Sequence, residues 1–137
     1  MGLKIPKVMI AAVKSGSGKT TVTCAFLKQL LCRKKHPVSF KCGPDYIDPM
    51  FHRTVLGIES ENLDLFFSSK EELREIYQAH GRCADLVVTE GVMGYYDGLG
   101  GIDTKASAYD LAAVTGTPAV LVVDTRGMSL SALAEIK

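Results

Sequence analysis

The chain has 137 residues, of which 47% are apolar and 23% are charged. That length suits a single domain with its own core, and the composition excludes a disordered or collagen-like protein. Sixteen basic and fifteen acidic side chains leave a formal net charge of +1, so electrostatics give no reason to expect a nucleic-acid or membrane-surface partner.

Apolar strands and amphipathic helices alternate along the chain. Apolar runs predict buried strands over residues 8–13, 86–89 and 119–123, and residues 38–42 (VSFKC) are expected to form a further short strand. Helices are expected over residues 19–35, from Pro49 with Asp48 as N-cap, after the capping box of Ser69 and Glu72, over residues 104–116 and over residues 129–136. The apolar face of the first helix would carry Val22, Ala25, Phe26 and Leu30. The pattern predicts an α/β fold with a mostly parallel sheet and helices on both faces.

Further features of the sequence concern the cellular compartment of the protein and the extent of the domain. Four cysteines at positions 24, 32, 42 and 83 form no zinc-type pair, which favours reduced thiols in a cytoplasmic protein. The first apolar run, residues 8–13, is too short for a signal-peptide core or a membrane span. The last helix has hardly begun at residue 137, so we expect the domain to be incomplete at its C-terminus.

A glycine-rich segment between the first strand and the first helix predicts a phosphate-binding loop. The expected nucleotide ligands are Ser15, Gly16, Ser17, Gly18, Lys19, Thr20 and Thr21. Glycines let backbone N–H groups curl around an anion, while Lys19 supplies charge to the phosphates and Thr20 a hydroxyl to Mg²⁺. Val13 stands where the usual first glycine would be, and Lys14 is an extra lysine. This loop resembles the deviant form of MinD/ParA-type and dethiobiotin-synthetase-like ATPases; a Gly/Ser turn with solvated lysines is the alternative.

Acidic side chains follow the predicted strands at the edge where the phosphate loop lies. Asp45 and Asp48 follow the second strand, Glu90 follows the third, and Asp97 lies in the loop after it. Open α/β sheets bind ligands at this edge, and carboxylates there can hold Mg²⁺. Simpler roles stay open: Asp48 as a helix N-cap, and Asp45 and Asp97 as turn residues.

Longer segments resemble one known family. They are residues 14–27, 38–52 (VSFKCGPDYIDPMFH), 62–67, 90–101 (EGVMGYYDGLGG) and 109–129. They closely resemble the ATP-binding domain of the cobyrinic acid a,c-diamide synthases. The resemblance implies a P-loop NTPase fold and an ATP- and Mg²⁺-dependent ligase of cobalamin biosynthesis. Such a ligase converts two carboxylates of a corrinoid to amides through acyl phosphates.

The resemblance also implies roles for individual residues. Lys14 and Lys19 would neutralise phosphate charge, and Thr20, Asp45 and Glu90 would hold Mg²⁺. The residues Asp48 and Asp97 would lie near the reacting carboxylate or a second metal. Tyr46 would shape the corrinoid side of the pocket, unless it is a packing aromatic.

The family takes its ammonia from glutamine through a further amidotransferase domain, and no cysteine of this chain has the G-x-C-x-G surroundings of that domain's nucleophile. We therefore expect no glutamine hydrolysis by these residues alone. Two alternatives compete: a MinD/ParA-type regulatory ATPase, and a non-catalytic ATP-binding fragment. The segment KCGPDYIDP argues against the first. Corrinoid and glutamine or ammonia are the expected partners, without nucleic acid or membrane, and a homodimer stays open.

Overall fold

The computed structural model describes residues 5–136 and contains one parallel sheet with helices on both faces. Its five strands, in the spatial order β3-β2-β4-β1-β5, are β1 Lys7–Ala12, β2 Pro37–Cys42, β3 Ser60–Leu63, β4 Leu86–Glu90 and β5 Ala119–Val122. The helices are α1 Lys19–Cys32, α2 Ile47–Thr54, α3 Lys70–Gly81, α4 Ala108–Thr115 and α5 Ala132–Ile136, with a 3₁₀ turn at Leu99–Gly101. The predicted α/β class is confirmed.

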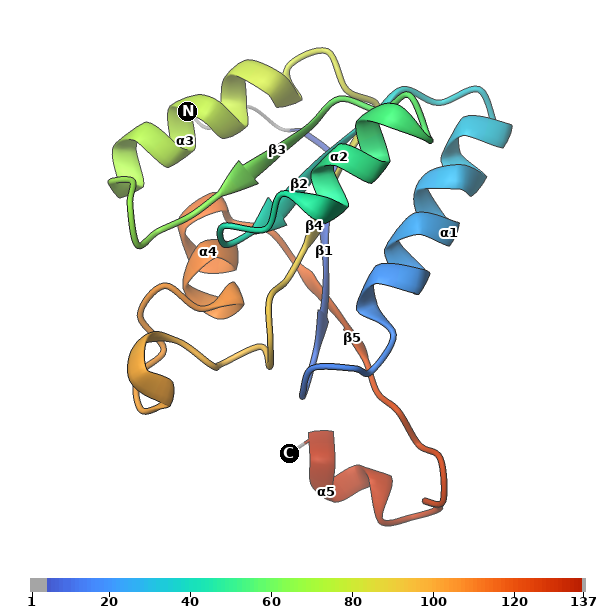
Figure 1. The fold of residues 1–137 in the computed structure, drawn as a ribbon, viewed down its shortest axis with the longest axis vertical. Helices are drawn as coiled ribbons and strands as arrows, with labels where there is room; N and C mark the ends of the chain where they lie inside the picture. The colour runs from blue at the N-terminus through green and yellow to red at the C-terminus, as the bar shows by residue number, and fades with distance from the viewer. Residues whose placement is uncertain (1–4, 137) are drawn as a thin grey trace.

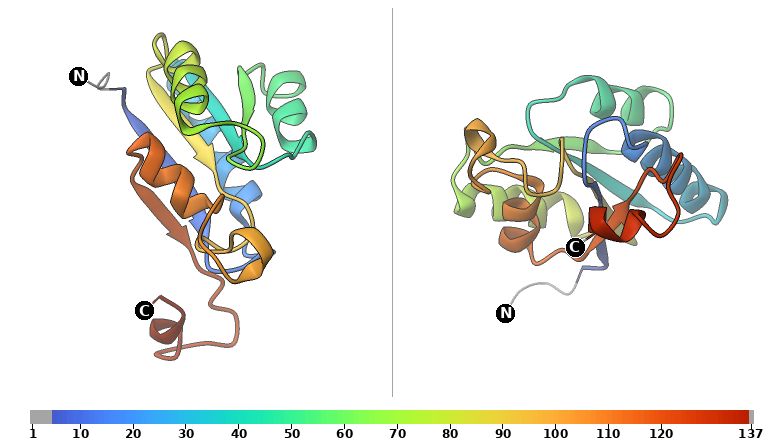
Figure 2. Two further views of the ribbon diagram at one scale, coloured as in Figure 1. Left: turned by 90° about the vertical axis from the view of Figure 1, so that its left-hand side faces the viewer. Right: turned by 90° about the horizontal axis from the view of Figure 1, so that it is seen from below.

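Helices α1 and α2 cover one face of the sheet, and α3 and α4 cover the other (Figures 1 and 2). Successive strand residues point to opposite faces, so each central strand contributes to two cores. In β4, Val87 packs under α3 and α4, whereas Val88 packs against Leu27 of α1. Because all strands run parallel, their carboxyl ends and the loops that follow them meet at a single edge.

The fifth strand, β3, was not predicted. Its sequence SENL contains no apolar run, and only Ser60 and Leu63 of this strand are buried. β3 is an edge strand that pairs with β2 alone, so its other residues remain partly exposed and can be polar. The prediction relied on strands that are apolar on both faces, a pattern an edge strand does not need.

Other predictions differ in detail from the structure. Two residues of the predicted inner face of α1, Phe26 and Leu30, pack against the core around Leu27. The other two, Val22 and Ala25, are exposed, so the face was predicted correctly only in part. The helix predicted from residue 104 begins at Ala108, capped by the Ser107 hydroxyl, which accepts from the Asp110 N–H. β5 was expected to be buried, but this edge strand is largely exposed, and Val122 is partly buried against the core around Leu27. The capping box of Ser69 and Glu72 is confirmed at α3.

The core interpretation makes a testable prediction with a matched pair of leucines. Leu27 of α1 is fully buried, whereas Leu133 of α5 is 55% exposed. Leu27→Ala should lower the free energy of unfolding by about 2–5 kcal/mol, since it removes buried methylene groups and leaves a cavity. Leu133→Ala should change it by less than about 0.5 kcal/mol. Urea denaturation followed by circular dichroism measures both, and equal losses would contradict the packing described for α1.

Candidate active site

The glycine-rich loop joins β1 to α1 at the carboxyl edge of the sheet and forms an anion-binding geometry. Gly16 and Gly18 have φ angles of 76° and 95°, in the left-handed region that other residues rarely adopt. The first turn of α1 contains no acidic residue and receives no side-chain cap. The helix N-terminus is therefore available to an anion such as a phosphate.

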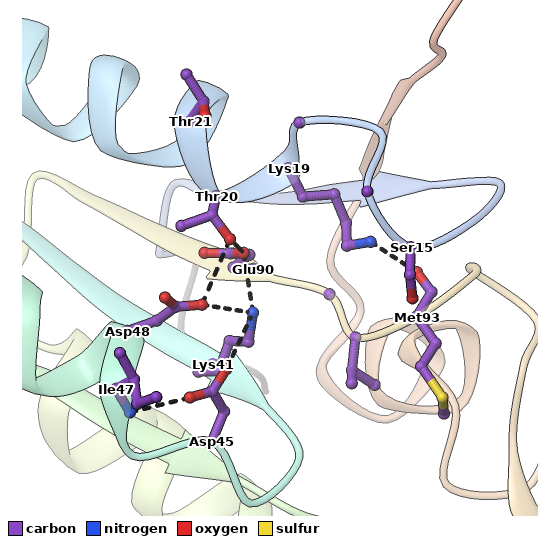
Figure 3. Close-up of a pocket in the computed structure, with 14 residues that line it drawn as sticks. Ser15, Lys19, Thr20, Thr21, Lys41, Asp45, Ile47, Asp48, Glu90 and Met93 are labelled. Atoms are coloured by element: carbon purple, nitrogen blue, oxygen red, sulfur yellow. Dashed lines mark hydrogen bonds and ion pairs between the residues drawn. The ribbon is translucent and has the colours of Figure 1, made fainter.

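A cavity of about 490 Å³ opens beside this loop (Figure 3). Of the predicted site residues, those that line it are Ser15, Gly16, Gly18, Lys19, Thr20, Thr21, Asp45, Asp48 and Glu90. The cavity is completed by Lys41 of β2 and by residues after β4. The structure thus brings the phosphate loop and three of the four predicted acids to one hollow.

Four predicted residues lie outside the lining of this cavity: Lys14, Ser17, Tyr46 and Asp97. Lys14 is exposed, and its carbonyl accepts a hydrogen bond from the Ser17 hydroxyl at 3.0 Å. Asp97 accepts a hydrogen bond from the Gly94 N–H at 2.9 Å and so closes the turn after Met93. That turn is tight, because a Cβ at Gly94 would lie 2.5 Å from both the Val13 carbonyl oxygen and Asp97 Oδ2. Asp97 therefore has the turn role that the sequence left open.

Lys19 is buried and turned toward the loop that follows β4. Its Nζ donates to the Met93 carbonyl at 2.8 Å and lies 3.5 Å from the Lys14 carbonyl. Burial lowers the pKa of Lys19, and the nearby charge of Lys41 lowers it further. Met93 has a φ of 45°, unusual for a residue with a side chain, and this turns its carbonyl to the ammonium. A bound phosphate would offer Lys19 a charged acceptor in place of these carbonyls.

The acidic residues gather around a lysine that the sequence analysis did not single out. Lys41 Nζ lies 2.8 Å from Asp48 Oδ2, 2.9 Å from Glu90 Oε1 and 3.7 Å from Asp45 Oδ2 (Figure 3). Lys41 and Glu90 are direct neighbours in the register of β2 and β4, which places the two charges side by side. Burial would lower the pKa of Lys41, but the attraction of Glu90 and Asp48 outweighs it and raises the pKa. A lysine inside a buried strand that ends at the ligand edge was the available signal.

Each carboxylate is oriented by further hydrogen bonds. Glu90 is fully buried, and its Oε1 accepts from the Thr20 hydroxyl at 2.6 Å. Asp45 Oδ1 accepts from the Ile47 N–H at 2.9 Å, the turn geometry that the sequence left open. Asp48 is not the N-cap of α2, because the helix already begins at Ile47 and the Asp48 carboxylate faces Lys41.

The donor set suits a magnesium ion that also has phosphate ligands. The second oxygen of Glu90, Oε2, is buried without a hydrogen-bond partner, which leaves one lone-pair site for a cation. Within residues 5–136, no group of three histidine, cysteine, aspartate or glutamate side chains is arranged to hold a metal as it stands. Mg²⁺ commonly takes one or two carboxylates and completes its shell with water and phosphate oxygens. Thr20, Asp45 and Glu90 are the residues that could hold it.

Tyr46 lies at the rim of the site rather than in the core. It is 75% exposed, which excludes the packing role that the sequence left open. Together with Pro44, Ile47 and Val92 it borders a second hollow of about 390 Å³, which also touches Asp45. An apolar surface therefore adjoins the acidic cluster.

A buried histidine connects α2, the helix that carries Asp48, to the sheet through hydrogen bonds. His52 has no exposed surface, and its Nδ1 lies 3.0 Å from Ser39 Oγ of β2 and 3.4 Å from Ser60 Oγ of β3. Its Nε2 lies 3.7 Å from Cys24 Sγ of α1. Burial lowers the pKa of His52 and so favours the neutral imidazole. One turn of helix separates this anchor from Asp48.

Comparison with known proteins agrees with this geometry. The profile of the CobQ/CobB/MinD/ParA nucleotide-binding domain (CbiA) matches residues 8–131. The chain belongs to this family. It is 46% identical over 132 residues to a cobyrinate a,c-diamide synthase of Thermoplasma acidophilum, covering 96% of this chain and 30% of that protein. A synthase of the same name from Listeria innocua is 46% identical over 129 residues, covering 93% of this chain and 28% of that protein.

A more distant relative, the cobyrinate a,c-diamide synthase of Methanocaldococcus jannaschii, is 38% identical over 131 residues, with 96% of this chain and 29% of that protein covered. The chain thus spans less than a third of the length of these relatives. The resemblance seen in the sequence is confirmed. Among the residues that the structure describes, no helix is both long and apolar enough to cross a membrane.

The buried histidine predicts a pH dependence of stability. Because the pKa of His52 is lower in the folded than in the unfolded chain, the unfolded state binds more protons as pH falls below about 6.5. Stability should therefore be lost toward acid, and more steeply in the wild type than in His52→Gln. Urea denaturation between about pH 7.5 and 5.5 measures both slopes. His36→Gln, which changes an exposed imidazole outside this contact, is the matched control. A wild-type slope in His52→Gln would contradict the prediction.

Proposed function

We propose that this chain is the ATP-binding, carboxylate-activating part of a cytoplasmic cobyrinate a,c-diamide synthase. The observation that carries the proposal is the single cavity in which the phosphate loop faces Asp45, Asp48 and Glu90. The names of the relatives supply the substrate class, a corrinoid with free carboxylates.

The phosphate groups of ATP would lie in the loop at the N-terminus of α1. Lys19 would exchange the Met93 carbonyl for a phosphate oxygen, and Lys14 would add charge from the exposed side of the loop. Thr20, Asp45 and Glu90 would hold Mg²⁺, which neutralises phosphate charge when bound. Phosphoryl transfer depends mainly on positioning and on charge, and this site provides both.

The reaction would join the corrinoid to ammonia in two steps. An oxygen of the corrinoid carboxylate attacks the γ-phosphorus of ATP, and ADP leaves with the electron pair of the broken P–O bond. Ammonia then attacks the acyl carbon, loses a proton, and inorganic phosphate leaves. Asp48 and Asp97 are assigned to the reacting-carboxylate side, and Tyr46 to the corrinoid rim. Glutamine would supply the ammonia through a domain other than this one.

One observation favours a second candidate, a MinD/ParA-type ATPase that acts as a homodimer. Lys14 is exposed and does not line the cavity of its own chain, as expected of a lysine that reaches a nucleotide across a dimer. ATP turnover with and without corrinoid separates the two functions: stimulation by corrinoid supports the synthase, and stimulation by dimerisation alone supports the ATPase.

Nucleotide binding by the loop can be measured on the chain itself. Lys19→Ala should weaken Mg-ATP binding at least tenfold, because the loop loses its buried phosphate counter-charge. Lys14→Ala should lower turnover more than affinity, since this lysine acts from the exposed side. Lys28→Ala, on the exposed face of α1, is the matched control. Isothermal titration measures affinity, and equal losses of affinity in Lys14→Ala and Lys19→Ala would contradict the distinction.

Amidation is best tested in a chimera, in which this chain replaces the matched 132 residues of the Thermoplasma acidophilum relative. With Mg-ATP, cobyrinic acid and ammonium chloride, the chimera should form the diamide, and hydroxylamine should trap the acyl phosphate as a hydroxamate. Asp45→Asn and Glu90→Gln should each lower turnover at least a hundredfold, which is about 2.7 kcal/mol in activation free energy.

The matched control for these variants is Glu75→Gln, an exposed change on α3. Normal turnover by Asp45→Asn would contradict its assignment to the metal. Failure of the chimera to form any hydroxamate, with Mg-ATP still bound, would contradict the proposed reaction.

A further inference from the structure

We propose that the Lys41 ammonium is a built-in cation that occupies the magnesium position of the metal-free chain, and that Mg²⁺ binds by displacing it. The inference rests on the proposed function, because it assumes that Asp45 and Glu90 are magnesium ligands. It adds a role for a residue that neither the sequence pattern nor the relatives' names assign.

The first argument is that the lysine and the metal compete for the same carboxylates. Lys41 Nζ lies within 2.9 Å of Asp48 Oδ2 and Glu90 Oε1 and within 3.7 Å of Asp45 Oδ2. Among residues 5–136, these three carboxylates have no other ion-pair partner. Figure 3 shows the Lys41 ammonium between the three acids, among the residues that line the cavity.

The second argument is steric and electrostatic. Mg²⁺ requires oxygens at about 2.0–2.1 Å in a near-octahedral shell. The Lys41 ammonium, in hydrogen-bond contact with Asp48 and Glu90, occupies part of the space that this shell would need, and it repels a second cation in a buried site. The position of the Lys41 ammonium between the acids also explains why, among the described residues, these acids are not arranged to hold a metal as they stand. Metal entry therefore requires Lys41 to move.

The third argument is that Lys41 is able to move and has a place to go. Its four-carbon stem has rotatable bonds, and the residue lines the cavity in which the phosphates would lie. The displaced ammonium would gain phosphate oxygens in exchange for carboxylate oxygens. Magnesium and nucleotide should then bind with positive cooperativity, since each stabilises the arrangement that the other requires.

The fourth argument concerns the metal-free protein. Glu90 is fully buried, and an unpaired buried carboxylate is strongly destabilising. Lys41 supplies positive charge from the neighbouring strand, directly beside Glu90.

Metal binding by the nucleotide-free chain tests this exchange. Lys41→Met should raise the affinity for Mn²⁺, followed by the electron paramagnetic resonance of free Mn²⁺, at least tenfold, with Mg²⁺ as competitor. Lys19→Met removes an equal charge from the same cavity but one that bonds to carbonyls, and should raise the affinity less than threefold. Equal gains in the two variants would indicate a general charge effect and overturn the inference, as would an unchanged or lower affinity in Lys41→Met.

A measurement on the wild-type chain covers the case in which Lys41→Met does not fold. The ¹H–¹⁵N signal of the Lys41 ammonium, assigned by its loss in Lys41→Arg, should shift during a Mg²⁺ titration with the same midpoint as metal binding. A signal that stays in place at saturating Mg²⁺ would overturn the inference. Neither measurement uses ATP or corrinoid, so failure of the amidation assay alone would leave the exchange intact.

Discussion

The carboxylate of Glu90 is ionisable and fully buried, and the site around it is organised to keep its charge compensated. Parallel pairing of β2 with β4 places Lys41 directly beside it, at the carboxyl ends of both strands. Thr20, in the first turn of α1, donates a hydrogen bond to Glu90, and Asp48 of α2 lies beside the Thr20 hydroxyl. One buried charge thereby links two strands, the phosphate loop and a helix, and a change in any of these elements alters the balance of charge at the cavity.

The two loops on this edge depend on backbone conformations that few residues adopt. Gly16 and Gly18 take positive φ angles in the phosphate loop, and Met93 does so after β4 without being a glycine. Met93 is held there by the tight Gly94–Asp97 turn. Its carbonyl serves as the acceptor for Lys19, so the loop after β4 is bonded to the phosphate loop. Filling the loop with phosphate would release this bond, which connects nucleotide binding to the segment that carries Asp97.

Helix α2 connects the acidic cluster to the apolar rim, and its position depends on a buried polar contact. His52 forms hydrogen bonds with hydroxyls of β2 and β3, and Asp48, one helical turn earlier, accepts a hydrogen bond from Lys41 at the cavity. Tyr46 and Ile47, at the start of the same helix, project into solvent beside Asp45. The helix thus links the exposed apolar rim to the charged centre.

The sequence alone determined the α/β class, four of the five strands, the phosphate loop and the acids at one edge, because apolar runs, glycine spacing and strand ends are local signals. It did not reveal β3, an edge strand whose half-exposed residues need not be apolar. Nor did it reveal Lys41 as part of the site, since a lysine in a strand does not by itself show which residue of another strand lies beside it. Only the register of β2 against β4 decided that this lysine lies beside Glu90, because strand pairing brings together residues 49 positions apart in the chain.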